Sequence, residues 1–162
     1  IRCLLPEDRA GVANLLTACY AGHPTVSNMA NRCGALRDAG DIPLELVWSD
    51  QGAILGYLAF LRHLQPAGWW ALTCLVVHPR HRRRGLADAL LRQGLDIARQ
   101  HRVKAVTVNG DPGFFRRFGF SLKAADLLTG SPSDAPLMLY PIRPGTAGIA
   151  AELRYPSVRL PA

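Results

Sequence analysis

The sequence predicts an α/β domain whose mixed sheet carries helices on its faces. Two observations lead to this prediction. Apolar runs of strand length alternate with helical stretches along most of the 162 residues. Some runs follow one another across short turns, which favours antiparallel neighbours, whereas a long helix separates two others, which favours a parallel pair. The length suits one domain, and the 49% hydrophobic content is enough to form a core.

The first forty residues predict a strand and two helices. Residues 1–5 are a short apolar run that suits an edge strand. Residues 6–20 start with a proline and two acids, as helix N-termini often do, and continue at helical spacing. The side chains expected to face inward are those of Val12, Leu15, Leu16 and Cys19. A second helix is predicted for residues 26–39, after which a glycine ends it.

Three strands and the strongest helix signal come next. Residues 44–49 and 53–62 form two strands around a turn, and residues 69–77 form a long apolar strand. The helix at 85–101 has its polar residues on one side and its leucines on the other, so we expect its apolar face to cover the sheet. A strand rich in β-branched residues, 105–108, follows it.

The last third predicts shorter elements. A short helix is expected at residues 114–117, a strand resumes at 120–122, and a last strand occupies 137–140. The element order is therefore β-α-α-β-β-β-α-β-α-β plus a final strand. We expect residues 1–141 to form one domain, and residues 142–162, which contain three prolines, to form an extension packed on it or trailing from it.

No apolar run reaches the roughly 18 residues that cross a bilayer, and residues 1–8 lack the apolar segment of a signal peptide. The four cysteines, Cys3, Cys19, Cys33 and Cys74, do not have the spacing of metal ligands. We expect them to be mostly buried, reduced thiols of a cytoplasmic protein that binds no metal.

The basic residues predict an anionic partner. The net charge is +7, and only two of the 19 basic residues are lysines, so 17 are arginines, whose planar guanidinium suits phosphate oxygens. Four arginines directly precede the helix at 85–101: Arg80, Arg82, Arg83 and Arg84. A helix N-terminus exposes unpaired backbone N–H groups, and Gly85 allows a ligand to approach the main chain. This position favours a phosphate site over a solvated basic loop or a nucleic-acid patch.

Two segments resemble the signatures of the GNAT superfamily of N-acetyltransferases. Residues 77–87 (VHPRHRRRGLA) resemble its acetyl-CoA pyrophosphate loop, Gln/Arg-x-x-Gly-x-Gly/Ala. The residues at the fixed positions are Arg82, Gly85 and Ala87. Residues 110–120 (GDPGFFRRFGF) resemble the second signature, in the form found in a bacterial branch whose substrates are mostly unassigned. Residues 153–156 (LRYP) are also similar to that branch.

The resemblance implies the family's fold, acetyl-CoA as co-substrate and no metal. The thioester would lie between the strands 69–77 and 105–108, and the backbone N–H of Val76 would polarise its carbonyl as an oxyanion hole does. The residues expected to contact the cofactor are Leu75, Val76, Val77, Arg82, Arg83, Arg84, Gly85, Leu86, Ala87, Asn109 and Phe115. The acceptor amine would attack the thioester directly, and CoA thiolate would leave.

The sequence departs from the family's pattern at two places. Many members have a tyrosine, four residues before the glycine of the second signature, that protonates the leaving sulfur, and here that residue is Phe115. In addition, regular alternation puts Ala71, Thr73 and Leu75 on one face of their strand, where only Thr73 is polar and suited to orient a water molecule. The general acid and the general base are therefore not assigned.

The remaining candidates for the base are Glu45, His23 and His63, although residues of these kinds are more often structural. Cys74 is expected to point away from Thr73 and has no evident histidine partner, so we do not expect a covalent intermediate on it. Trp69 and Trp70 either form an aromatic wall for the acceptor or divide between the core and the rim.

We expect an N-acetyltransferase that acts on a primary amine of a small molecule or a protein. The alternative is an acyl-CoA-binding regulatory module with weak or no catalysis, which Phe115 and the missing base favour. The family builds acceptor pockets from loops equivalent to residues 22–27 and 123–135. We expect no nucleic-acid or membrane partner, and either a monomer or a homodimer.

Overall fold

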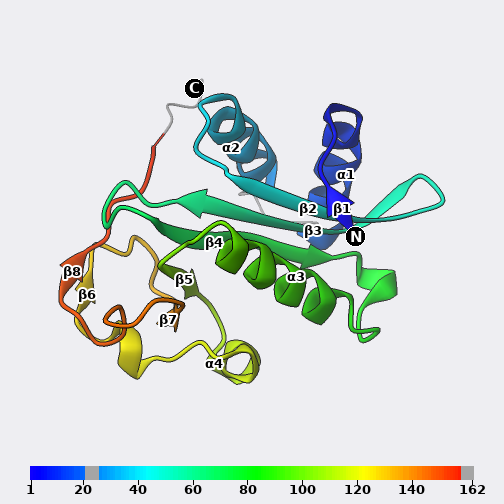
Figure 1. Cartoon of the computed structure of the whole chain (residues 1–162). Helices are drawn as coiled ribbons and strands as arrows, with labels where there is room; N and C mark the ends of the chain where they lie inside the picture. Colours follow the sequence, from blue (N-terminus) through cyan, green and yellow to red (C-terminus); the bar gives the residue numbers. More distant parts are fainter. Residues whose placement is uncertain (21–25, 158–162) are drawn as a thin grey trace. The chain divides into compact units, whose positions relative to one another are not determined.

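The computed structural model describes residues 1–20 and 26–157 (Figure 1). Its helices and strands, in chain order, are β1 (Arg2–Cys3), α1 (Arg9–Cys19), α2 (Val26–Asp38), β2 (Leu44–Asp50), β3 (Ala53–Arg62), β4 (Trp69–Val77), α3 (Leu86–Gln100), β5 (Ala105–Asn109), α4 (Pro112–Phe115), β6 (Leu128–Thr129), β7 (Leu137–Pro141) and β8 (Ala151–Glu152). Short 3-10 turns occupy Pro6–Asp8, Pro79–His81, Arg116–Phe118 and Lys123–Ala125. None of the helices described is long and apolar enough to cross a membrane.

The strands form a mixed sheet, as the sequence predicts. The strand order is β1-β2-β3-β4-β5-β7, and a second, smaller sheet pairs β6 with β8. Short turns join antiparallel neighbours such as β2 and β3, whereas α3 connects the parallel strands β4 and β5. The parallel ladder joins residues 69–71 to residues 105–107, and β4 then continues to Val77.

The chain divides into two compact units. Unit 1 contains mainly residues 1–60 and 74–94, and unit 2 contains residues 61–73 and 95–156. In unit 1, α1 and α2 lie on one side of β1, β2 and β3, and the first half of α3 lies on the other (Figure 1). The core on the α1 side consists of Val12, Leu15, Leu16, Val47, Tyr57, Ala59, Cys74 and Val76.

Close contact between α3 and β3 requires glycine in unit 1. A Cβ at Gly56 would lie 2.9 Å from the side chain of Leu90, and a Cβ at Gly94 would lie 2.9 Å from that of Phe60. Alternate residues of β3 therefore divide between the two faces, with Gly56 and Phe60 toward α3 and Tyr57 toward α1. The helix approaches the sheet closely because two of the facing positions have no side chain.

Strand β4 contains a β-bulge that reverses its side-chain alternation. His63 N donates to Trp69 O (2.9 Å), and His78 N donates to Leu55 O (2.8 Å). Between these two bonded pairs the first strand has seven residues, 56–62, and the second has eight, 70–77. One residue of β4 is therefore extra, as in a bulge.

The bulge corrects an expectation about the face of β4. Trp69 and Cys74 are five positions apart, so regular alternation would put their side chains on opposite faces of the strand. The extra residue puts them on the same face. Ala71 shares the face of Trp69, since the ladder with β5 is regular from 69 to 71, whereas Leu75 is opposite to Cys74. The predicted common face of Ala71, Thr73 and Leu75 is thus wrong, because period-two alternation does not continue through a bulge.

Unit 2 has a core of its own. Its buried members are Trp69, Ala105, Ala124, Ala125, Leu128, Leu139 and Leu153. β7 pairs antiparallel with all five residues of β5. The segment after β7 returns to the unit, because β8 pairs with β6 and Arg154 forms an isolated bridge with Gln65. The part of the C-terminal segment that the structure describes is therefore tied to the strands by backbone hydrogen bonds.

Several local predictions are wrong. Residues 120–122 do not form a strand, because only Ser121 bridges to Leu139 and a 3-10 turn follows directly. Cys3 is exposed rather than buried, since it lies on the short edge strand β1. Trp69 and Trp70 are both buried, at 2% and 8% exposure, so neither lies at a rim. The strands β6 and β8, of two residues each, are too short to be visible as patterns in the sequence.

Candidate functional site

The loop between β4 and α3 ends in an open helix N-terminus. Gly85 has a φ of 76°, in the left-handed region that favours glycine, and α3 begins at the next residue, Leu86. A Cβ at Gly85 would meet no atom within 4 Å, so the main chain faces open space there. Ala89 N donates to Gly85 O (3.0 Å). The N–H groups of Leu86 and Ala87 precede that bond and have no carbonyl within the helix to donate to, which suits them to an anion.

Short-range hydrogen bonds hold the shape of this loop. The ring of His78 accepts from Arg80 N at Nδ1 (3.1 Å), and His81 N donates to His78 O (2.8 Å). Arg82 Nε donates to Val77 O (3.4 Å), which joins the loop to the end of β4. The sequence analysis assigns no role to His78. A polar residue directly before a proline at a helical turn is the signal that could have identified it as a cap.

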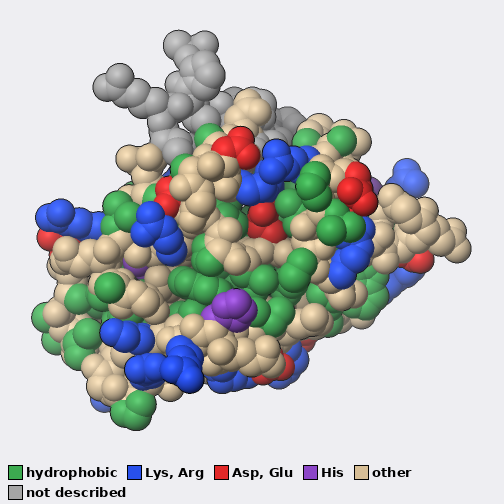
Figure 2. Space-filling view, turned by 45° about the horizontal axis from the view of Figure 1, so that its top comes forward, with side chains coloured by type: hydrophobic (Ala, Val, Ile, Leu, Met, Phe, Trp, Pro, Cys, Tyr) green, Lys and Arg blue, Asp and Glu red, His purple; other side chains and the backbone are tan. Residues whose placement is uncertain are grey.

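The arginines beside the helix N-terminus are exposed: Arg80, Arg82, Arg83 and Arg84. Arg84 Nη1 lies 3.4 Å from His81 Nδ1. On the face drawn in Figure 2, Lys and Arg side chains lie in several separate groups rather than in one continuous patch. A small local group of guanidinium ions suits one diphosphate better than a long polyanion, whose binding needs many phosphate contacts.

The last residues of β4 lie beyond its ladder with β5, which covers residues 69–71. Val76 and Val77 are buried, at 7% and 8% exposure, and Val76 packs in the core of unit 1. Thr73 and Leu75 are half-buried. Cys19 Sγ donates to Val77 O (3.3 Å). The cofactor contacts of Leu75, Val76 and Val77 stay a prediction.

Asn109 and Phe115 lie in unit 2. Asn109 Nδ2 donates to Ser131 Oγ (2.9 Å) and to Ala135 O (3.2 Å), so the side chain joins β5 to the loop before β7. Phe115 is 9% exposed, and its ring packs against Phe120 with centroids 5.5 Å apart. This position therefore holds a buried apolar ring and supplies no proton.

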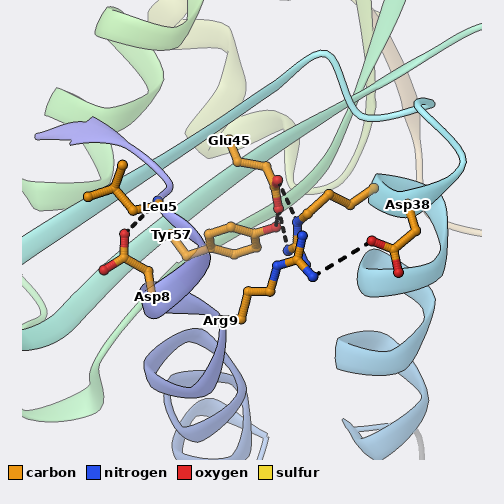
Figure 3. A network of polar contacts seen from close by, with 7 residues as sticks. Leu5, Asp8, Arg9, Asp38, Glu45 and Tyr57 are labelled. Carbon is orange, nitrogen blue, oxygen red and sulfur yellow. Dashed lines mark hydrogen bonds and ion pairs between the residues drawn. The ribbon is translucent and has the colours of Figure 1, made fainter.

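Glu45 is not a free carboxylate. Arg37 donates to it twice, from Nε to Oε2 (2.8 Å) and from Nη2 to Oε1 (2.6 Å), and Tyr57 Oη donates to Oε1 (2.5 Å). Figure 3 shows this carboxylate above the ring of Tyr57, with a separate contact between Arg9 and Asp38. Burial raises the pKa of Tyr57, whose hydroxyl therefore stays a donor. Glu45 joins α2 to β2 and β3, and these donors take three of the four lone-pair sites of its carboxylate.

The remaining candidates for a catalytic base or nucleophile are His23, His63 and Cys74. His23 lies outside the described residues. His63 is 3% exposed, and burial lowers its pKa to about 4, so the imidazole is neutral at pH 7. Burial raises the pKa of the Cys74 thiol, which therefore carries no thiolate at neutral pH. In residues 1–20 and 26–157, no group of three or more His, Cys, Asp or Glu side chains is arranged to hold a metal ion.

Comparisons with known proteins agree with this geometry. The model of the Acetyltransferase (GNAT) family matches residues 10–120. A protein of Escherichia coli K12, the uncharacterized N-acetyltransferase YhbS, is 32% identical over 128 residues, which are 76% of this chain and 74% of that protein.

Solved structures of two relatives have the same fold, and they contain CoA or acetyl-CoA. The crystal structure of Escherichia coli YhbS in complex with CoA matches with a TM-score of 0.83 and 28% identity, and the match covers 95% of this chain and 87% of that one. A GNAT family acetyltransferase from Brucella melitensis, in complex with acetyl-CoA, matches with a TM-score of 0.79 and 25% identity over 96% of this chain and 94% of that one.

The family match spans more than half of the chain and includes both the loop before α3 and residues 110–120. The chain belongs to the GNAT family of acetyl-CoA-dependent N-acetyltransferases.

Proposed function

We propose that the protein transfers an acetyl group from acetyl-CoA to a primary amine of a small molecule or a protein. The observation that carries the proposal is the open N-terminus of α3, with Gly85 at a φ of 76° and exposed arginines around it. The diphosphate of CoA would accept from the N–H groups of Gly85, Leu86 and Ala87. The guanidinium groups of Arg82, Arg83 and Arg84 would neutralise its charge.

The end of β4 would hold the rest of the cofactor. Because His78 N donates to Leu55 O on β3, alternation turns the backbone of Val76 toward β3 as well, whereas Leu75 and Val77 present theirs to the other side, where they would pair with the amides of pantetheine. The donor to the thioester oxygen, predicted at Val76, would therefore be the N–H of Leu75 or Val77, and such a donor contributes about 10²–10³ in rate. We also propose that Asn109 and Phe115 contact the cofactor.

The acetyl transfer requires a proton to leave the acceptor. An alkyl ammonium with a pKa of about 10.4 is almost entirely protonated at neutral pH, so a base or a water chain must receive its proton before attack. The nitrogen then bonds to the thioester carbon, the carbon–sulfur bond breaks, and the second proton that the nitrogen loses passes to water or to the departing thiolate. A thiolate with a pKa of about 8.5 is a tolerable leaving group, so the absence of a hydroxyl at Phe115 slows the step without preventing it. Thr73, half-buried on β4, remains our candidate for orienting a water molecule.

The alternative function is a regulatory module that binds acyl-CoA and turns it over weakly or not at all. Two observations favour it: Phe115 has no hydroxyl, and the carboxylate of Glu45 is occupied by Arg37 and Tyr57. Titration calorimetry with CoA, followed by thiol release from acetyl-CoA over a panel of primary amines, separates the two functions. Turnover with an amine supports the enzyme, and CoA binding without turnover on any amine supports the module. Absence of binding contradicts both.

A further inference from the structure

The carbonyl oxygen of Val77, at the end of β4, accepts hydrogen bonds from two side chains in the part of unit 1 that the structure describes. Cys19 Sγ, on α1, donates to it at 3.3 Å. Arg82 Nε, in the loop before α3, donates to it at 3.4 Å. A peptide carbonyl has two lone pairs, so these two donors match its full capacity to accept.

This carbonyl lies on the edge of β4 that faces away from β3. His78 N donates to Leu55 O on β3 (2.8 Å), and a Cβ at Gly56, also on β3, would lie 3.7 Å from Val76 O. The backbones of residues 76 and 78 therefore both face β3. Because backbone groups alternate in direction along a strand, Val77 presents its N–H and C=O to the opposite edge. A pantetheine amide that donates to the strand there would be a third donor to Val77 O.

Arg82 is the protein donor that a diphosphate can draw away from this carbonyl. Its bond to Val77 O, at 3.4 Å, is longer than the roughly 2.7–3.2 Å of ordinary N–H···O hydrogen bonds, so little stabilisation is lost when it breaks. A guanidinium makes short, charge-assisted bonds to phosphate oxygens, often two at once, whereas a carbonyl carries no charge. Arg82 is exposed, and only two residues separate it from Gly85 at the start of α3.

The other donor, Cys19, has no such reason to leave. Its side chain packs against the core of unit 1, and the helix continues through it, since Tyr20 N donates to Leu16 O (3.0 Å). Burial raises the pKa of the Cys19 thiol, while Arg82 acts in the opposite direction. The thiol is therefore protonated at neutral pH, which keeps it a donor without a charge that would attract phosphate. The exchange at Val77 O thus concerns the bond from Arg82.

We propose that Arg82 couples the two halves of the cofactor: it donates to Val77 O until a bound diphosphate draws it away, and that carbonyl then accepts from pantetheine. The proposal rests on the proposed function, since it requires CoA to bind along β4. The two halves then bind cooperatively, and each raises the affinity for the other by the same factor. The exchange of one hydrogen bond corresponds to a factor of about two to ten. A thioester without a diphosphate is therefore disfavoured by more than its missing contacts.

The first experiment measures the coupling with the two halves of CoA as separate probes. Pantetheine is titrated into the whole protein, with and without saturating inorganic pyrophosphate, and its dissociation constant is obtained by NMR. We expect pyrophosphate to tighten pantetheine binding about two- to tenfold in the unmodified protein. Arg82→Met should bind pantetheine equally well with and without pyrophosphate, and as tightly as the unmodified protein does with it.

Two further variants separate this role from a general effect of charge. Arg84→Met is the matched control, because it removes the same charge from the loop while the Arg84 guanidinium lies beside His81 Nδ1 (3.4 Å). It should weaken pyrophosphate binding and keep the coupling at saturation. Cys19→Ala frees the other lone pair of Val77 O. It should tighten pantetheine binding about two- to tenfold without pyrophosphate, which tests the competition even if Arg82→Met does not fold.

The ¹³C resonance of the Val77 carbonyl reports the exchange directly. Pyrophosphate alone should shift this resonance in the unmodified protein and in Arg84→Met, because the bond from Arg82 is lost in both. The shift should be absent in Arg82→Met, in which that bond cannot form.

Three results overturn the proposal. The first is a pantetheine affinity that pyrophosphate leaves unchanged in the unmodified protein. The second is a coupling that persists in Arg82→Met. The third is weaker pantetheine binding in Arg82→Met, as expected if Arg82 bridges Val77 O and the diphosphate at the same time.

Calorimetry with CoA on the same proteins keeps this test distinct from that of the proposed function. CoA binding without coupling between pantetheine and pyrophosphate contradicts the role of Arg82 alone. Absence of CoA binding contradicts the proposed function and, with it, the role of Arg82.

Discussion

Arg37 meets the carboxylate of Glu45 with two nitrogens, at 2.8 and 2.6 Å, while only 16% and 8% of the two side chains are exposed. The hydroxyl of Tyr57, which is fully buried, completes the group. The carboxylate therefore holds α2 against β2 and β3. This geometry explains why a carboxylate on a strand of the sheet is a structural residue here.

We predict that Glu45→Gln lowers the free energy of unfolding by about 3 kcal/mol, because it leaves the guanidinium of Arg37 buried without its counter-charge. Urea unfolding measures this loss. Asp38→Asn is the control, since its ion pair with Arg9, at 3.7 Å, is exposed and should contribute less than about 1 kcal/mol. A Glu45→Gln variant of unchanged stability that loses all acetyl transfer would show instead that Glu45 is the base.

We predict that Gly85→Glu abolishes CoA binding without unfolding the protein. The new carboxylate would repel the diphosphate at the N-terminus of α3, and the left-handed φ disfavours any side chain there. The measurements are calorimetry with CoA and circular dichroism. Gly145→Glu is the matched control, since that glycine also has a positive φ, of 86°, and open space around its Cβ position. Full CoA affinity in a folded Gly85→Glu protein would exclude this loop as the diphosphate site.

We predict opposite signs for two glycine-to-alanine changes inside helices. Gly94→Ala should destabilise the protein by about 1–3 kcal/mol, because its Cβ would lie 2.9 Å from Phe60 and 3.2 Å from Leu58. Gly34→Ala should stabilise it by about 1 kcal/mol, because only the end of the Arg37 side chain comes within 4 Å and alanine favours the helix. Thermal unfolding of both variants tests the packing of α3 on β3. Equal effects of the two changes would contradict that packing.

We predict that stability falls as the pH is lowered from about 6.5 to about 4, partly because of His63. The pKa of its imidazole is lowered to about 4 by burial, whereas an unfolded histidine titrates near 6.5. The unfolded chain therefore binds more protons in this window, and the stabilisation from neutral His63 is full above 6.5 and lost toward 4. A shift of this size corresponds to roughly 3 kcal/mol. Unfolding midpoints across this pH range should fall less steeply in His63→Gln than in the unmodified protein, and identical slopes would contradict the assignment.

Several elements could be predicted because each depends on neighbouring residues. The end of β4, Gly85 and the start of α3 follow one another in the chain, so the loop that we propose to bind phosphate is visible as a local pattern. The amphipathic spacing of α3 and the apolar run of β4 likewise depend on residues within one element. For the same reason their predicted bounds differ from the structure by no more than one residue.

Other features depend on which segments meet. The bulge in β4 is an extra residue relative to β3, and no property of β4 alone shows it. The pairing of Glu45 with Arg37 and Tyr57 joins three elements, and the contact of His63 with Tyr155 joins residues 92 positions apart in the chain. Local propensity sets which backbone shape a segment prefers, whereas the burial of a charge or of an unpartnered polar atom depends on what the folded chain packs around it.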